Sequence, residues 1–300
     1  MIRLILLLAL AAAALVNVGA EAASSPAGRL RVSATRFLKP DGSQFEWRGI
    51  SAFRLVEMFA HGKQTEGAAY LDWAAEQQLT VVRVLTMATH LFQLSPEDGV
   101  KALPELLEKA AQRGLYVEIV ALADTADVPM DLAAHVKAVG AIAARHPNAV
   151  VELANEPGHQ TQARVLHDPG YVQRLARLIP DAVPVALGSI EYGDGYSGGD
   201  YITWHAPRGH DHVATLQRGA ALLRRFGKPV VSDEPIGAAD AAVAGRRDDS
   251  PARFRDAAIQ TKRAGMGATF HYEGGLQAKL PSKVEMACLI AWRSGLGPRE

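Results

Sequence analysis

Two glutamates occupy equivalent places in the sequence, each directly after a short run of apolar and β-branched residues. The first run leads into Asn155-Glu156-Pro157, and the second leads into Asp233-Glu234-Pro235. Two carboxylates facing one cleft can cleave a glycosidic bond: one protonates the leaving oxygen while the other attacks the anomeric carbon or activates water. Either glutamate alone could be a surface residue, and Asp233 could face the cleft in place of Glu234. The pair predicts glycosidic chemistry if the fold brings the two runs together.

Strand-like and helix-like segments alternate along the chain from residue 45 onward. Short runs rich in β-branched residues are followed by longer amphipathic segments, an order that indicates βαβ units and a parallel sheet. The predicted strands are 45–50, 80–85, 116–121, 150–154, 183–187, 201–205, 229–233 and 268–272, and the predicted helices are 68–78, 104–113, 133–145, 170–178, 212–225, 251–264 and 282–292.

Eight such units predict an α/β fold, a single-domain (β/α)8 TIM barrel. The length of 300 residues suits that fold, and no Gly-x-Gly-x-x-Gly follows the first strand to favour an open dinucleotide-binding sheet. Residues 188–200 are rich in Gly, Asp, Ser and Tyr, so we expect the fifth helix to be missing or reduced to a loop. Active sites of such barrels form at the C-terminal ends of the strands. Glu156 and Glu234 end the fourth and seventh predicted strands, so both should face the barrel mouth.

The motifs resemble those of the clan A glycoside hydrolases, and especially the cellulase family, family five, over nearly the whole chain after its first residues. Asn155-Glu156-Pro157 matches the clan's acid/base motif, and residues 228–234 resemble its nucleophile strand. Residues 41–51 resemble the opening strand with its Arg-Gly pair, residues 81–84 the second strand with its Arg, and Trp204-His205 the sixth strand.

The resemblance implies a role for each matching residue. Glu156 would be the general acid/base and Glu234 the nucleophile, with Arg83 holding it ionised. Asn155 would bind the sugar 2-hydroxyl, and His205 would lie at the sugar site. Clan A enzymes retain configuration, which implies a covalent glycosyl-enzyme and carboxyl groups roughly 5–5.5 Å apart. The implied substrate is a β-linked glucan, mannan or related oligosaccharide, and no cofactor is implied.

Three strand ends depart from the family's pattern. The third usually ends in His, where this chain has Leu122-Ala123-Asp124, and the sixth usually gives His-x-Tyr, where it has His205-Ala206-Pro207. The eighth usually carries a Trp platform for the sugar, which Tyr272 or His271 would have to replace. These departures indicate a divergent member. They leave one alternative from another class, a catalytically impaired barrel that binds carbohydrate or a protein partner.

Histidines are frequent near the predicted mouth, and a metal-dependent hydrolase is a third alternative. His210-Asp211-His212 could converge with His205 and His271 on an ion. The first strand, however, lacks the His-x-His of barrel metallohydrolases, so we predict no metal. Trp204, at a strand end, either stacks on a sugar or packs in the core. The predicted substrate-binding residues are Arg83, Asn155, Trp204, His205 and Tyr272.

The charge balance and the first residues bear on partners and location. Lys plus Arg and Asp plus Glu number 32 each, so no basic surplus favours a nucleic-acid partner. An apolar run after Arg3, followed by Ala20-x-Ala22, is typical of a cleaved secretory signal. We expect residues 1–22 to be that signal, residues 23–300 to form the barrel, and the protein to be secreted or periplasmic without stable membrane insertion after cleavage. The sequence does not predict the oligomeric state.

Overall fold

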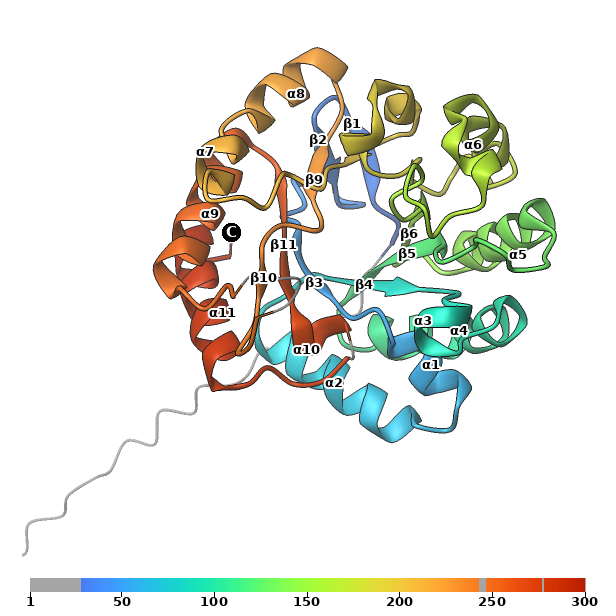
Figure 1. Cartoon of the computed structure of the whole chain (residues 1–300), viewed down its shortest axis with the longest axis horizontal. Coiled ribbons are helices and arrows are strands. Elements are labelled where there is room, and N and C mark those ends of the chain that lie inside the picture. The colour runs from blue at the N-terminus through green and yellow to red at the C-terminus, as the bar shows by residue number, and fades with distance from the viewer. Residues whose placement is uncertain (1–27, 243–246, 277, 300) are drawn as a thin grey trace, which may run out of the picture.

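The computed structural model describes residues 28–242, 247–276 and 278–299. The predicted signal over residues 1–22 therefore lies outside the described residues. Within the described ranges, helices cover a central ring of strands (Figure 1). None of the helices in these ranges has both the length and the apolar character that crossing a membrane requires.

Eight parallel strands form the barrel, and the predicted fold class is confirmed. The strands are β3 (Arg48–Ser51), β4 (Val81–Leu85), β5 (Tyr116–Leu122), β6 (Ala149–Ala154), β7 (Val185–Ala186), β8 (Ile202–Thr203), β9 (Val230–Ser232) and β11 (Gly267–Tyr272). Except for β7 and β8, each strand pairs in parallel with the next, and β11 returns to β3. A single parallel bridge between Ser189 and Thr203 joins β7 to β8. The ring is therefore nearly closed, because only this single bridge connects β7 and β8.

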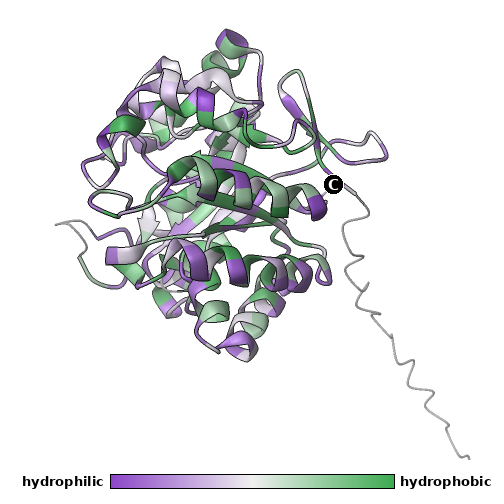
Figure 2. Cartoon of the chain, turned by 90° about the vertical axis from the view of Figure 1, so that its right-hand side faces the viewer, coloured by the Kyte–Doolittle hydropathy of each residue, from purple (hydrophilic) through white to green (hydrophobic). Residues whose placement is uncertain are grey.

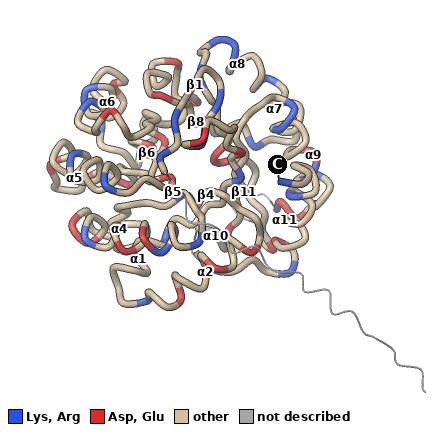
Figure 3. The backbone as a smooth tube through the Cα atoms, turned by 180° about the vertical axis from the view of Figure 1, so that it is seen from behind, with Lys and Arg blue, Asp and Glu red and all other residues tan. Residues whose placement is uncertain are grey.

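Helices lie outside the ring, as the alternating pattern predicts. They are α1 (Leu55–Ala60), α2 (Gln64–Glu76), α3 (Thr89–Phe92), α4 (Pro96–Ala111), α5 (Leu132–Arg145), α6 (Pro169–Ala176), α7 (His212–Leu216), α8 (Gly219–Phe226), α9 (Pro251–Ala264), α10 (Glu273–Leu276) and α11 (Lys283–Leu296). The central strands are mostly apolar in Figure 2, and charges of both signs are distributed over the outer helices in Figure 3. This distribution fits strands that are buried on both faces.

Three segments show how local sequence sets the helices. After β7 the chain makes only two short 3-10 turns, Ile190–Tyr192 and Asp194–Gly198, which confirms the expected loss of the fifth helix. The predicted helix 212–225 is instead divided into α7 and α8, and α8 begins at Gly219, which packs against the side chain of Met266. Helix α4 begins eight residues before the predicted start at Pro104, because Ser95 caps it and Pro96 takes its first position.

The barrel interior is divided into an apolar bottom and a polar middle. At the N-terminal end of the strands, a hairpin of β1 (Arg31–Ser33) and β2 (Arg36–Leu38) covers the opening. Its Phe37 packs with Trp47 and Tyr201, over a layer of inward residues that includes Val81, Val150 and Val231. One layer higher the inward residues are charged. The hairpin and this apolar layer together form an apolar plug, which separates the charged residues from solvent at the bottom of the barrel.

Substitution of Gly99 tests how closely α4 packs on the loop after β4. A Cβ at Gly99 would lie 1.7 Å from the backbone oxygen of Thr86. Alanine normally favours a helix over glycine by about 1 kcal/mol. Here we expect Gly99→Ala to lower the free energy of unfolding by roughly 1–3 kcal/mol, because the backbone must shift. Urea denaturation measures the change. In the control Gly170→Ala, the new methyl would contact only the side chains of Asp168 and Arg174, and equal losses in both variants would contradict the prediction.

Candidate active site

Glu156 and Glu234 lie at the same rim of the barrel. Glu156 follows β6 and Glu234 follows β9, and the C-terminal ends of parallel barrel strands share one face. Glu156 has φ of 45°, a left-handed value that is uncommon for a residue with a side chain. Such strained positions concentrate at functional sites, where the surrounding structure imposes them. The Glu156 side chain is 25% exposed and that of Glu234 is 8% exposed, so Glu156 is the more open of the two.

His205 lies between the two carboxylates. Its Nδ1 is 3.3 Å from Glu156 Oε1 and 3.9 Å from Glu234 Oε2, and its Nε2 is 3.5 Å from Asp233 Oδ2. Burial alone would lower the pKa of His205, but the charges of Glu234 and Asp233 raise it well above its usual value. The ring is therefore an imidazolium at neutral pH. One cation thus contacts both candidate catalytic groups, which brings them close enough to act on a single sugar.

Each oxygen of the Glu234 carboxylate accepts a hydrogen bond from a different arginine. Arg83 Nη1 donates to Oε1 and Arg208 Nη2 donates to Oε2, both at 2.7 Å. Burial by itself would raise the pKa of Glu234, but His205, Arg83 and Arg208 together hold it well below its usual range. Glu234 is therefore ionised across the whole neutral range, as a nucleophile requires.

Below this rim, Arg83 is surrounded by three further buried carboxylates. It donates to Glu152 at 2.6 Å and 2.9 Å, and its Nε lies 3.4 Å from Asp233 and 3.7 Å from Glu118. Burial raises the pKa of Glu152 to about 7, with Arg83 opposing that rise, and burial next to Asp233 raises the pKa of Glu118 well above its ordinary value. Burial therefore raises the pKa values of Glu118 and Glu152 in this layer, whereas the neighbouring cations lower that of Glu234 above it.

The structure brings three of the five predicted substrate-binding residues to the rim. Arg83 and His205 contact Glu234 directly, and Asn155 Oδ1 accepts a hydrogen bond from Arg83 Nη2 at 2.9 Å. That bond orients the Asn155 amide, whose NH2 group has no partner among the described residues. Asp233 is fully buried beside Arg83, whereas Glu234 accepts a hydrogen bond from the partly exposed Arg208.

Trp204 and Tyr272 point away from the mouth, which corrects the expectation that they line it. Side chains along a strand alternate between its faces. Because Thr203 and His205 face inward, Trp204 packs in the apolar layer under the helices. Because His271 faces inward, Tyr272 faces α2, where its hydroxyl lies 2.8 Å from that of Tyr70 and donates to the carbonyl of Lys279.

His271 takes the inward place at the end of the eighth strand. Its Nδ1 lies 2.8 Å from Ser51 Oγ. Burial and, after it, the charge of Arg208 lower its pKa to about 3, so this ring is neutral. It therefore presents a polar edge near Glu234, where family five usually has the face of a tryptophan.

Two residues that the sequence analysis did not single out occupy the places of the missing His and Tyr. Asp124 accepts hydrogen bonds from the backbone nitrogens of His90 and Leu91 at 2.7 and 3.0 Å, so it fixes the start of α3 beside the mouth. Arg208, one residue beyond the position of the usual Tyr, donates a hydrogen bond to Glu234. The only sequence signal was that each is a charged residue shortly after a strand end.

Two groups of side chains have the spacing of a metal site, Glu152 with His205 and Asp233, and Glu156 with His205 and Glu191. In the first group an ion would lie beside the guanidinium of Arg83, which already contacts both carboxylates. Both groups share His205, whose imidazolium supplies positive charge itself. His212 is bound instead to the carbonyl of Pro207 at 3.0 Å. We therefore assign no metal to these residues.

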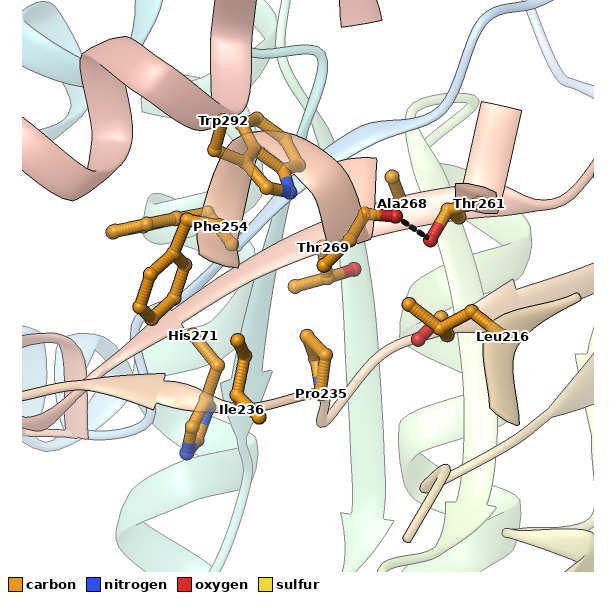
Figure 4. A pocket seen from close by; sticks show the side chains of 12 residues that line it. Leu216, Pro235, Ile236, Phe254, Thr261, Ala268, Thr269, His271 and Trp292 are labelled. Carbon is orange, nitrogen blue, oxygen red and sulfur yellow. Dashed lines mark hydrogen bonds between the residues drawn. The ribbon is translucent and has the colours of Figure 1, made fainter. Parts of the chain in front are cut away.

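A small cavity lies behind the rim, between β11 and helices α9 and α11 (Figure 4). Its volume is about 10 Å³, and Phe254 and Trp292 form much of its lining. It is a packing defect in the apolar layer and is too small for a sugar ring.

Several solved structures that share this fold are glycoside hydrolases. A putative glycoside hydrolase from Bacteroides vulgatus matches with a TM-score of 0.64 and 15% identity, over 87% of this chain and 60% of that one. A β-glucanase from Saccharophagus degradans, solved with cellotetraose, matches with a TM-score of 0.64 and 12% identity, over 89% and 94%. A family 5 mannosidase from Rhizomucor miehei matches with a TM-score of 0.62 and 12% identity, over 83% and 86%.

These likenesses confirm, at the level of the fold, the resemblance to family five. The chain spans less than two thirds of the length of the Bacteroides vulgatus proteins that it matches. No protein-family model matches the sequence, and no curated protein matches it. The low identities fit a divergent barrel.

Substitution of Glu118 tests whether burial raises the pKa of the carboxyls below the rim. Its pKa is raised in the folded protein, so folding takes up a proton and the free energy of unfolding falls as pH rises above the unfolded value of about 4.3. Glu118→Gln removes this cost and still accepts the hydrogen bond from Tyr201. We expect a higher Tm at pH 8, by about 2–4 °C for each kcal/mol gained.

The same stabilisation should vanish near pH 4, where the Glu118 carboxyl is protonated in both states. Calorimetry across this pH range measures it. Glu105→Gln, at an exposed position of α4, is the matched control and should change little at either pH. A Glu118→Gln variant that is less stable at pH 8 than the wild type would show that the carboxylate is ionised and needed there.

Proposed function

We propose that the protein is a retaining glycoside hydrolase that cleaves β-linked glucan, mannan or a related oligosaccharide by double displacement. The observation that carries the proposal is the rim itself, where Glu156 and Glu234 both lie within 4 Å of one His205 nitrogen. These distances are compatible with the carboxyl separation of roughly 5–5.5 Å that retention needs, because both groups lie close to the same atom.

The chemistry divides into two steps. In the first, Glu234 forms a bond to the anomeric carbon as the glycosidic C–O bond breaks, and the leaving oxygen takes the proton of Glu156. In the second, Glu156 takes a proton from water, which attacks the same carbon and releases Glu234. Arg83 and His205 keep Glu234 anionic before attack, and Asn155 is placed by Arg83 to donate to a sugar hydroxyl.

The structural neighbours support the substrate class. The β-glucanase was solved with cellotetraose, and the Rhizomucor miehei enzyme is a mannosidase. Both carry the fold described here. We also propose that the chain acts outside the cytoplasm, secreted or periplasmic, on the strength of the signal-like pattern in residues 1–22.

Covalent trapping tests the nucleophile. After incubation with 2-deoxy-2-fluoro β-glycosides that carry an activated leaving group, we expect intact-mass spectrometry to show a stable adduct on Glu234. Glu234→Ala should lose hydrolysis by a factor of about 10⁴ or more, with partial rescue by azide as the inverted glycosyl azide. Asp233→Ala should retain measurable hydrolysis. An adduct on Asp233, or full activity in Glu234→Ala, would reject the assignment.

Glu156→Gln tests the acid/base. We expect turnover to be lost on substrates with poor leaving groups and largely kept on activated aryl glycosides in the first step, because these depart without a proton. Rates measured on the two substrate types, with circular dichroism to check the fold, give the result. Equal losses on both types would remove Glu156 from the acid role.

The alternative, a barrel that binds carbohydrate without cleaving it, has one observation in its favour. The aromatic residues expected to stack on a sugar, Trp204 and Tyr272, are turned into the core. Absence of any adduct and of hydrolysis across a broad glycoside panel would favour this alternative.

A further inference from the structure

Arg208 covers the open side of the candidate nucleophile. Glu234 Oε1 points into the barrel toward Arg83, and Oε2 points toward Arg208, whose side chain is 32% exposed. A sugar that approaches Glu234 from the mouth therefore meets the Arg208 guanidinium. Arg83 and His205 already favour the ionised carboxylate, so ionisation alone does not account for a second arginine.

The fold fixes the backbone that carries Arg208. Arg253 donates to the carbonyl oxygens of Arg208, at 3.2 Å, and of Gly209, and Arg253 is itself paired with Asp248. On the other side, the carbonyl of Pro207 contacts His212 Nδ1 at 3.0 Å. These contacts hold the loop on both sides of Arg208, so they fix the backbone position of this residue.

The proposed reaction removes the partner of Arg208. When Glu234 bonds to the anomeric carbon and the leaving oxygen takes the proton of Glu156, the carboxylate becomes a neutral ester. Arg83 still has Glu152 at 2.6 Å. Arg208 has no other carboxylate within ion-pair distance among the described residues. A partly buried cation without a counter-ion is costly, so an anion on the bound sugar would stabilise the intermediate.

We propose that the sugar bound next to Glu234 carries an anionic substituent, a carboxylate or a sulfate, that pairs with Arg208. This inference rests on the proposed function and narrows its substrate class to acidic glycosides. Guanidinium binds planar anions in bidentate fashion. The surroundings suit such a sugar: His271 replaces an aromatic platform, and Trp204 and Tyr272 offer no stacking surface.

In an alternative arrangement, Arg208 would pair during the reaction with another carboxylate of the protein and not with an anionic sugar. Glu191 and Glu273 are both close enough for the charge of Arg208 to lower their pKa values, against a larger rise caused by burial. If Arg208 turned to either of them during the reaction, a neutral sugar would suffice. The experiment must therefore compare acidic with neutral sugars directly.

The test is the ratio of kcat/KM for 4-nitrophenyl β-glucuronide to that for 4-nitrophenyl β-glucoside, with the 6-sulfated glucoside to separate carboxylate from sulfate. We expect the wild type to prefer one acidic sugar by roughly 10- to 100-fold, the value of a charged hydrogen-bonded pair. Arg208→Gln should abolish that preference. Arg225→Gln, an exposed arginine paired with Asp194, should leave it unchanged. A wild type that prefers the neutral glucoside, or a ratio unaltered in Arg208→Gln, would overturn the proposal.

A binding measurement separates this proposal from the hydrolase itself. If no glycoside is cleaved, calorimetric titration with glucuronic acid, glucose and glucose 6-sulfate still gives an answer. Binding of an acidic sugar that is lost in Arg208→Gln would support the anionic site while abandoning the hydrolase. Equal binding of acidic and neutral sugars, or no binding of any, would overturn the anionic site.

Discussion

The guanidinium of Arg83 is the interaction on which the site depends. It is fully buried and contacts Glu152, Glu118, Asp233 and Glu234. Isolated buried carboxylates would be strongly destabilising, and the apolar plug at the bottom of the barrel excludes the water that could otherwise solvate them. A central cation therefore allows the polar layer to exist. Because Arg83 extends from β4 across the interior, it also links Asn155 after β6 to Glu234 after β9.

The buried carboxyl groups fall into two groups by the direction in which the environment shifts their pKa values. Glu118 and Glu152, deep in the barrel, have raised pKa values, whereas Glu234, which meets Arg83, Arg208 and His205, has a lowered one. Carboxylates whose environments push their pKa values apart are characteristic of acid/base sites. Because the raised pKa values of Glu118 and Glu152 disfavour their charged forms, more of the positive charge of Arg83 is left to stabilise the carboxylate of Glu234.

The departures from family five are compensated by residues of different chemistry. Asp124 anchors α3 where a histidine is usual, Arg208 reaches the nucleophile in place of a tyrosine, and His271 presents a polar edge where a tryptophan is usual. Each replacement exchanges an aromatic or neutral group for a charged or polar one. Together they make the rim a surface for ion pairing more than for stacking, which is the physical basis for expecting an acidic ligand.

The sequence alone determined the strand order, the barrel and the placement of Glu156 and Glu234 at strand ends, because alternating units close in only a few ways and parallel strands end at one rim. It also indicated the loss of the fifth helix from the composition of residues 188–200. Only the tertiary structure decided which side chains face inward. Strands buried on both faces have no polar side to reveal their orientation, so Trp204, Tyr272 and Asp233 could be placed only after barrel closure had fixed the inner face of each strand. Arg208 lies on a loop, and the backbone that carries it is held by Arg253, which is 45 residues away in the sequence and reaches this loop only in the folded chain.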